Sequence, residues 1–230
     1  MQLSDDPLAI PLWINGHAYL TMTARFLDIC NPKTGEVLRR TPLCGADAAD
    51  KAVAAAQVAL PQWAACTDAA RAALLALVGE ALAGYATHFA KLIVEETGKD
   101  TDAAVAEVAG AVALLRAPPV VEASGVVAIV SDDTAPLAGA LSHAVAALLA
   151  GATVVIKPSP KAPSAIFALA ELTARSGLPD GVFNILQGDE AAVEGLCAAS
   201  DVRALLFAGD PLMATKVSAI AARFGKSFSV

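Results

Sequence analysis

Residues 125–156 read GVVAIVSDDTAPLAGALSHAVAALLAGATVVI, and this stretch decides the fold class. It contains an apolar run at residues 125–130 and an uncharged, β-branched run at residues 153–156, with a helical pattern from Leu137 to Leu149 between them. Strands that are apolar throughout are buried on both faces, and two such strands joined through a helix are typical of a parallel sheet. The stretch therefore predicts a strand–helix–strand unit of an α/β fold.

The same stretch contains an apolar run with the length of a membrane span. From Ala135 to Ile156 the chain carries no charge when His143 is neutral, and about 20 such residues suffice to cross a bilayer. Gly151 interrupts the run, and β-branched residues follow it. We therefore expect a buried helix followed by a buried strand, and no association with a membrane.

The alternation of strands and helices continues downstream. Further strands are predicted at residues 182–186 and 204–207, and the start of another at residues 227–230. Helices are predicted at residues 163–176, 191–199 and 211–224. Because crossovers between parallel strands are right-handed, residues 124–230 are predicted to form a doubly wound, Rossmann-like parallel sheet.

An extended region opens the chain. Residues 1–44 have the pattern of strands and turns, with Asn15-Gly16 as a hairpin turn and residues 31–38 as a second turn. We expect this region, the helices that follow it and the Rossmann-like part to form a single domain of residues 1–230.

A helical block, residues 45–119, connects the extended region to the sheet. Its helices are predicted at residues 52–65, 71–85, 88–96 and 101–116. Asp47 is the predicted N-cap at the start of the block, and Thr101 or Asp102 is the predicted N-cap of its last helix.

Composition narrows the classes of function. The 230 residues are 56% hydrophobic and 17% charged, which excludes intrinsic disorder. A net charge of −7 and an aromatic content of 5% argue against nucleic-acid binding.

The four cysteines form no CxxC pair and no Cys/His cluster, so we expect no metal site; they are Cys30, Cys44, Cys66 and Cys197. The acidic residues 1–6 lack the apolar core of a signal peptide, so we expect a cytoplasmic protein.

Ligands of doubly wound sheets bind beyond the carboxyl ends of the strands. The loops expected at that edge are residues 131–136, 157–162, 187–190 and 208–211. The chain contains no GxGxxG fingerprint, no phosphate-binding GxxxxGK[ST] loop and no HExxH motif. His17 falls in a hairpin and His88 and His143 fall in helices, so we interpret all three as structural.

These loops nevertheless carry a family resemblance. The runs that carry it are LAGATVVIKPSP at residues 149–160, GLPDGVFN at 177–184 with Gly188-Asp189 after it, FAGD at 207–210, NPKTGE at 31–36 and EETGK at 95–99. In this order they resemble the aldehyde dehydrogenase family over essentially the whole chain. The resemblance implies the N-terminal half of that family, which binds NAD or NADP at this edge of the sheet.

The resemblance also implies which residues would serve the site. The cofactor-binding positions are Lys157, Ser159, Gly188, Gly209 and Asp210, with Lys157 at the place of the lysine that contacts the adenosine ribose. Thr134 stands where the family has the asparagine that donates to the oxyanion, and we assign no catalytic residue. A solvated lysine before a proline turn is the alternative interpretation of Lys157.

Several residues depart from the family pattern. Asp132 and Asp133 stand where the family has Pro and Trp, and Pro160 stands where it often has a glutamate that binds the ribose hydroxyls. Asp210 replaces a serine at a helix N-terminus, where an aspartate uses the N–H groups itself and adds negative charge. Glu190 falls in a turn where the family prefers glycine. We therefore expect no tightly bound cofactor, although NAD or NADP remains the candidate.

Two family parts have no counterpart in these 230 residues. The sequence ends at Val230, before the segments that carry the family's general base and nucleophilic cysteine, and residues 117–124 are too few for the strand pair that builds the family's oligomer. We expect that the usual family dimer does not form and that a protein partner covers the face normally packed on the catalytic domain.

Three hypotheses follow from this comparison. The first is a non-catalytic pseudoenzyme that acts as a binding or regulatory partner. The second is the NAD(P)-binding half of a split dehydrogenase whose catalytic half is another chain. The third is a site for a cation or an amine, formed by Asp132, Asp133, Glu190 and Asp210.

Overall fold

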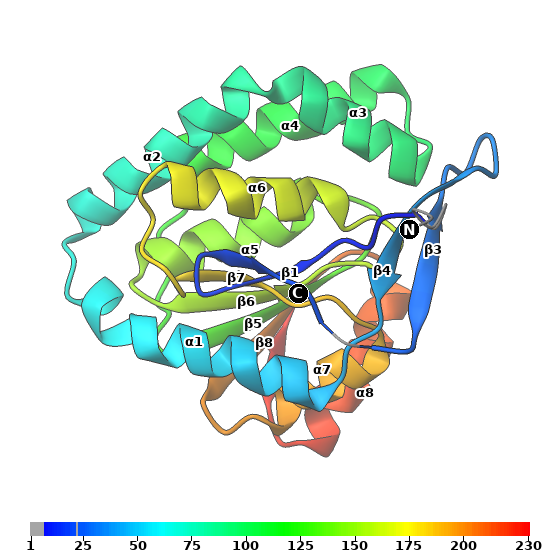
Figure 1. Ribbon diagram of the computed structural model, residues 1–230. Coiled ribbons are helices and arrows are strands. Elements are labelled where there is room, and N and C mark those ends of the chain that lie inside the picture. Colours follow the sequence, from blue (N-terminus) through cyan, green and yellow to red (C-terminus); the bar gives the residue numbers. More distant parts are fainter. Residues whose placement is uncertain (1–6, 22) are drawn as a thin grey trace, which may run out of the picture.

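The computed structural model describes residues 7–21 and 23–230, so the acidic residues 1–6 lie outside the described part of the chain. Within the described residues, one sheet has seven strands in the order β2-β1-β7-β6-β5-β8-β9, and β3 and β4 form a separate hairpin (Figure 1). The predicted doubly wound α/β fold is confirmed.

The strands that form the sheet have the following bounds: β1 Leu12–Ile14, β2 His17–Tyr19, β5 Val126–Ser131, β6 Thr153–Lys157, β7 Phe183–Ile185, β8 Val202–Ala208 and β9 Ser227–Ser229. The separate hairpin consists of β3 Phe26–Cys30 and β4 Val37–Pro42. Neighbours among β5 to β9 pair in parallel, whereas β1 pairs antiparallel with β2 and β7. From β5 the chain proceeds outward through β6 to β7, and then returns to β8 and β9 on the other side of β5.

The helices have the following bounds: α1 Ala46–Ala64, α2 Asp68–Gly84, α3 Ala86–Thr97, α4 Thr101–Arg116, α5 Ala138–Leu149, α6 Ser164–Arg175, α7 Glu190–Ala198 and α8 Pro211–Arg223. In Figure 1, α5 and α6 lie above the sheet with α2, α3 and α4 stacked over them, and α1, α7 and α8 lie below it. Each face of the sheet therefore has its own helical cover.

Two hydrophobic clusters correspond to these two faces. Val127 and Ile129 of β5 belong to the cluster of α2 to α6, whereas Val126, Ala128 and Val130 belong to the cluster of α1, α7 and α8. This alternation is the two-residue period of a strand, and both sets are apolar because both faces are covered. The interpretation of residues 125–130 as a strand buried on both faces is confirmed.

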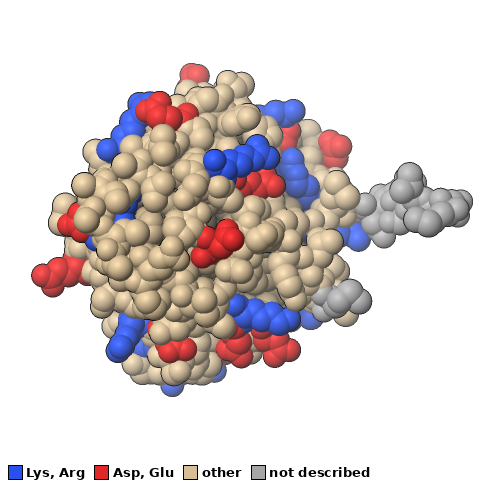
Figure 2. Space-filling model, turned by 60° about the vertical axis from the view of Figure 1, so that its left-hand side comes forward, with Lys and Arg blue, Asp and Glu red and all other residues tan. Residues whose placement is uncertain are grey.

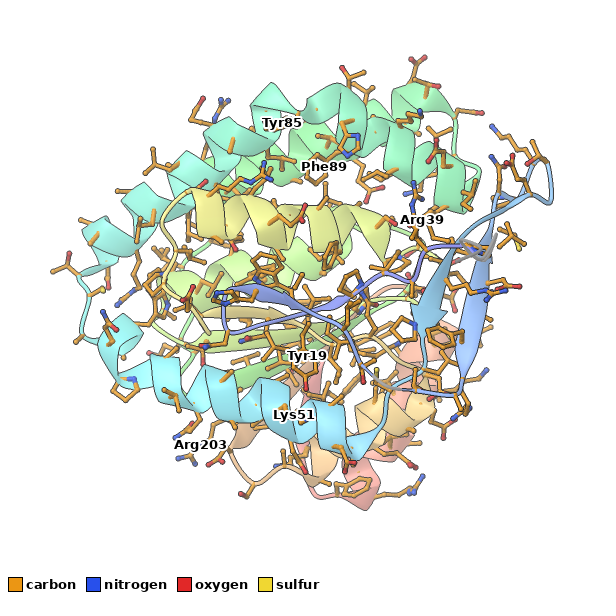
Figure 3. All side chains as sticks on the ribbon, viewed as in Figure 1. Tyr19, Arg39, Lys51, Tyr85, Phe89 and Arg203 are labelled. Atoms are coloured by element: carbon orange, nitrogen blue, oxygen red, sulfur yellow. The ribbon has the colours of Figure 1, made fainter. Side chains whose placement is uncertain are left out.

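The predicted N-terminal hairpin is confirmed. Its turn residues, Asn15 and Gly16, have φ values of 53° and 75°, which is the left-handed region that a two-residue hairpin turn requires. The hairpin also contacts α1, because Lys51 Nζ donates to the Tyr19 hydroxyl at 3.1 Å (Figure 3).

The predicted N-cap of the helical block is wrong. α1 begins at Ala46, six residues before the predicted start, and its N-cap is Gly45 without a side-chain bond. Asp47 lies inside the first turn. The cause is tertiary packing on α7, because a Cβ added at Gly195 would lie 2.8 Å from Cα of Ala46. The close approach of these two helices fixes where α1 starts.

The predicted N-cap of α4 is also wrong. The helix spans Thr101–Arg116, as predicted, but its N-cap is Asp100, and no side chain caps it. The helix predicted at residues 88–96 is α3, which Gly98 closes in the left-handed conformation with a φ of 70°.

No single helix among the described residues is long and apolar enough to cross a membrane. α2 and α3 together pass on length and composition, but they are bent by 73° at their break. The apolar run of residues 135–156 forms α5 and β6, as predicted. On the face shown in Figure 2, charged side chains are scattered among wide uncharged areas.

Candidate functional site

The carboxyl ends of the parallel strands meet at one edge of the sheet, beside the β3–β4 hairpin (Figure 1). Thr41 Oγ1 donates to the carbonyl of Pro160 at 2.7 Å, and Cys44 forms a β-bridge with Gly188. The chain leaves β5 toward β6 but reaches β8 on the opposite side, so the topological switch point lies between β5 and β8. Ligands of doubly wound sheets bind at such a point.

Asp132 occupies this switch point. Its side chain follows β5 and is buried, and Oδ2 accepts a hydrogen bond from the backbone N–H of Asp210 at 2.5 Å. Oδ1 accepts from the backbone N–H and from Oγ1 of Thr134, at 2.8 and 2.5 Å. A Cβ added at Gly209 would overlap the Asp132 carboxylate. The space above Gly209 is therefore filled by a side chain of the protein itself.

The N-terminus of α8 has carboxylates on its N–H groups. Asp210 is the N-cap, as predicted, and its Oδ1 accepts from the N–H of Leu212 at 2.8 Å. Pro211 at the first helical position has no N–H to offer. The N–H of Asp210 is bound by Asp132. Carboxylates thus already accept from two of the N–H donors that this helix N-terminus offers to an anion, those of Asp210 and Leu212.

The neighbouring carboxylate, Asp133, contacts the loop after β6 on the opposite side of β5 from Asp210. Ser159 Oγ, in the loop after β6, donates to Oδ1 of Asp133 at 3.1 Å and accepts from the N–H of Lys161 at 3.3 Å. Since β5 lies between β6 and β8, Asp132 and Asp133 connect the central loop to its neighbour on each side. The predicted site residues Ser159, Gly209 and Asp210 are thereby placed around one pair of carboxylates.

Lys157 is the last residue of β6, and only 6% of it is exposed. Burial lowers its pKa to about 8, and the charge of Asp189 opposes part of that shift. No hydrogen bond or ion pair joins its ammonium group to another residue in the described part of the chain. The alternative interpretation as a solvated lysine is therefore wrong.

The loop after β7 is held by contacts within the protein. A Cβ at Gly188 would lie 2.7 Å from the carbonyl oxygen of Cys44 and 2.5 Å from Cβ of Ala192, so the close approach requires glycine. Asp189 is the N-cap of α7 and forms an ion pair with Arg25 at 2.5 Å. The predicted position of Glu190 in a turn is wrong, because this residue begins α7.

The cysteines show no activated thiol. Cys44 lies beside this edge of the sheet although it is distant in sequence, and burial raises the pKa of its thiol. Burial likewise raises the pKa of Cys197 in α7. In the part of the chain that the structure describes, no hydrogen bond joins Cys30, Cys66 or either buried thiol to a histidine. Thr134, at the family's oxyanion position, is exposed and donates its hydroxyl to Asp132.

The histidines have the predicted positions in β2, α3 and α5. His143 contacts the carbonyl of Phe207 through Nε2 at 3.1 Å, and so joins α5 to β8. No cluster of His, Cys, Asp and Glu that could hold a metal ion occurs among the described residues.

Sequence reasoning missed how the carboxylates are used. The residues Asp132 and Asp133 were singled out for their charge, but their contacts depend on which strands flank β5. The spacing of a carboxylate two residues before Thr134 is a local signal for an Asx turn, and it accounts for one of the contacts of Asp132. The burial of Lys157 was predictable from the sequence, because Lys157 directly follows a run of apolar residues in the same strand.

Comparisons with known proteins agree with this architecture. The sequence profile of the aldehyde dehydrogenase family matches residues 19–118 and 119–230. Malonate-semialdehyde dehydrogenase of Pseudomonas aeruginosa is 31% identical over 235 residues, which cover 93% of this chain and 47% of that protein. The NADP-dependent succinate-semialdehyde dehydrogenase of Escherichia coli is 31% identical over 219 residues, 85% of this chain and 45% of that enzyme.

Solved structures give the same result. Lactaldehyde dehydrogenase from Escherichia coli superposes with a TM-score of 0.88 at 29% identity, covering 97% of this chain and 52% of that one. A structure from Sinorhizobium meliloti, of a protein taken to be a methylmalonate-semialdehyde dehydrogenase and complexed with NAD, has a TM-score of 0.88 at 25% identity and covers 98% of this chain and 50% of that one. The chain spans about half the length of the curated relatives it matches. From its profile, fold and motifs, this chain belongs to the aldehyde dehydrogenase family.

Proposed function

We propose that this domain is a non-catalytic member of the family that acts as a binding or regulatory partner rather than as a dinucleotide-binding domain. One observation carries the proposal, namely the buried carboxylate of Asp132 over Gly209 and on the N–H of Asp210. It fills the switch point at which a cofactor of a doubly wound sheet would lie.

The donor set at this point does not suit a pyrophosphate. A pyrophosphate needs free N–H donors and a positive field at a helix N-terminus. At α8 the N–H groups of Asp210 and Leu212 already donate to carboxylates, and both carboxylates would repel a phosphate. Lys157 could still donate to a ribose hydroxyl, but one contact does not replace the pyrophosphate site. The arrangement therefore does not fit NAD or NADP.

The remaining groups also disfavour catalysis by these residues. The Thr134 hydroxyl donates to Asp132, so it is not free to donate to a developing oxyanion. The two buried thiols have raised pKa values, so less of the reactive thiolate forms at neutral pH. Among the described residues, no cysteine thiol is hydrogen-bonded to a histidine that could act as its base.

The proposal is tested by titration with NADH and NADPH, following nicotinamide fluorescence. We expect no saturable binding by the natural chain up to millimolar cofactor. The double variant Asp132→Ser with Asp210→Ser removes both negative charges and the carboxylate that holds the N–H of residue 210, so we expect it to bind. Asp201→Ser is the matched control, because it removes one exposed carboxylate elsewhere and should behave like the natural chain. Saturable binding of the natural chain at micromolar cofactor would overturn the proposal.

That last outcome would favour the second candidate, the NAD(P)-binding half of a split aldehyde dehydrogenase. Its support is the buried, unpartnered ammonium group of Lys157 at the position of the family's ribose-binding lysine. A solved relative is complexed with NAD. The two candidates thus differ in one measurable property, the affinity of the isolated chain for the cofactor.

For the partner we propose an aldehyde dehydrogenase subunit that covers an apolar groove. The groove has a volume of about 950 Å³ and lies between residues 120–124, the end of α5 and the start of β8. Val120 and Val121 in its wall are 89% and 45% exposed, and Arg203, labelled in Figure 3, also lines it. The relatives contain about as much chain again as this one. We therefore propose that the groove is covered by a surface from the half of a full-length relative that this chain does not match.

A further inference from the structure

Lys157 has an environment unlike that of the other buried charged side chains. Its register partner on β5 is Val130, and Val130 and Leu186 belong to the apolar cluster on the same face. By contrast, buried Arg71 donates to Asp68 and to backbone carbonyls, and buried Glu96 accepts from Ser164 and Arg39. Lys157 is thus the exception to the rule that buried charges are paired.

The ammonium group of Lys157 is not completely closed off from solvent. Among the described residues, the fully buried side-chain polar atoms that lack a hydrogen bond are Ser131 Oγ and Gln187 Oε1. Nζ of Lys157 also lacks a hydrogen bond but is not one of these fully buried atoms, so it keeps some contact with solvent. It lies at the edge of the sheet where doubly wound folds bind ligands.

Burial changes the chemistry of this amine. Desolvation disfavours the ammonium form and lowers the pKa of Lys157 to about 8. A substantial fraction is then the free amine at mildly alkaline pH, whereas an ordinary lysine is almost entirely protonated there. Desolvated lysines of this kind are the amines that attack carbonyl groups.

The surrounding charges select the class of ligand. Asp189 acts on Lys157, Asp133 lies in the loop after β5, and Glu190 is the first residue of α7. These carboxylates disfavour an anion, and a cation would be repelled by the ammonium form of Lys157. A small neutral molecule with a carbonyl oxygen faces neither penalty.

We propose that Nζ of Lys157 condenses reversibly with a small neutral aldehyde to form an imine. The amine lone pair attacks the carbonyl carbon, and the carbonyl oxygen takes up a proton to give a carbinolamine. The carbinolamine then loses water, made up of that oxygen and the two protons that leave the amine nitrogen, and the C=N bond forms, so the step consumes no oxidant or reductant. The inference goes beyond the proposed function and does not depend on whether a dinucleotide binds.

Reductive trapping tests the inference on the full chain. The protein is incubated with propanal and sodium cyanoborohydride at pH 8, and the modified lysines are located by peptide mass mapping. We expect one rapidly formed adduct on Lys157, at least about tenfold faster than on the exposed Lys161, since the lower pKa gives more free amine. The rate at Lys157 should rise with a midpoint near pH 8.

Variants provide the controls. Lys157→Arg should abolish the fast adduct, and Lys161→Arg should leave it unchanged. Labelling spread over exposed lysines with Lys157 unmodified would overturn the inference, as would a fast adduct that persists in Lys157→Arg. The map of the natural chain alone is decisive even where a variant fails to fold.

Discussion

At the scale of the residue, Lys157 destabilises the fold that holds it. Its folded pKa of about 8 lies below the ordinary value of 10.5, so the folded state binds the proton less tightly than the unfolded state. A group with a depressed folded pKa contributes stability above its unfolded pKa, and this contribution is lost as the pH falls through the folded value. At neutral pH the charged side chain therefore disfavours folding.

Lys157→Met should stabilise the protein at pH 7, by up to about 3 kcal/mol, because it removes the cost of burying the charge. The difference from the natural chain should shrink between pH 8 and 10.5, where the natural side chain loses its proton in both states. Urea unfolding at a series of pH values measures this. Lys161→Met is the control for an exposed lysine, and a gap that does not change with pH would contradict the assignment.

The residue scale also shows what the sequence could and could not predict at the site. The N-cap role of Asp210 was predictable, because it depends only on its neighbours in the chain. The contact of Asp132 with Asp210 was not, because 78 residues separate them and the contact depends on β8 lying beside β5. Local chemistry is readable from a sequence, whereas contacts between loops require the strand order.

At the scale of the element, the start of α6 depends on one buried carboxylate. Glu96, near the end of α3, accepts from the N–H of Ser164 at 3.0 Å and from its hydroxyl, and pairs with Arg39 at 3.1 Å (Figure 3). It thereby satisfies a donor at the first turn of α6 and joins α3, α6 and β4. Burial raises the pKa of this carboxyl, and its hydrogen bonds oppose the shift.

Glu96→Ala should lower the free energy of unfolding by about 3 kcal/mol, because it leaves the buried N–H and hydroxyl of Ser164 without an acceptor and removes one of the two carboxylates that pair with Arg39. Glu95→Ala is the matched control. Glu95 also pairs with Arg39 but is more exposed, so its loss should be below about 1 kcal/mol. Denaturant midpoints of the two variants decide the matter, and equal losses would show that Glu96 is not the anchor.

Element boundaries were predictable where backbone chemistry sets them. Gly98 ends α3 because only glycine easily adopts its left-handed conformation, and the range of α4 follows from its apolar period and the prolines after it. The start of α1 was not predictable, because the approach of Ala46 to Gly195 of α7 determines it. A capping residue is a local signal in the sequence, so it does not predict a contact between residues that are 149 positions apart, such as Ala46 and Gly195.

At the scale of the whole molecule, the groove beside α5 and β8 is the surface proposed for a partner. Val121→Asp should abolish the complex with a purified aldehyde dehydrogenase of the same organism, because a charge in an apolar interface loses its hydration. Sedimentation velocity on the mixture measures the complex. Val105→Asp is the matched control, because Val105 has a similar exposed fraction, 51%, on α4 outside the groove. Failure of the natural chain to form any complex would reject this partner.

The paired carboxylates of Asp132 and Asp133 have a consequence for how the molecule responds to its surroundings. They join the loops after β6, β5 and β8, so the conformational entropy of these loops is lost during folding and not on contact with a ligand. A domain organised in this way presents one fixed shape. Under the proposal that no dinucleotide binds, changing nucleotide levels would not shift the equilibrium between states of this domain, because mass action requires a ligand that favours one state over another.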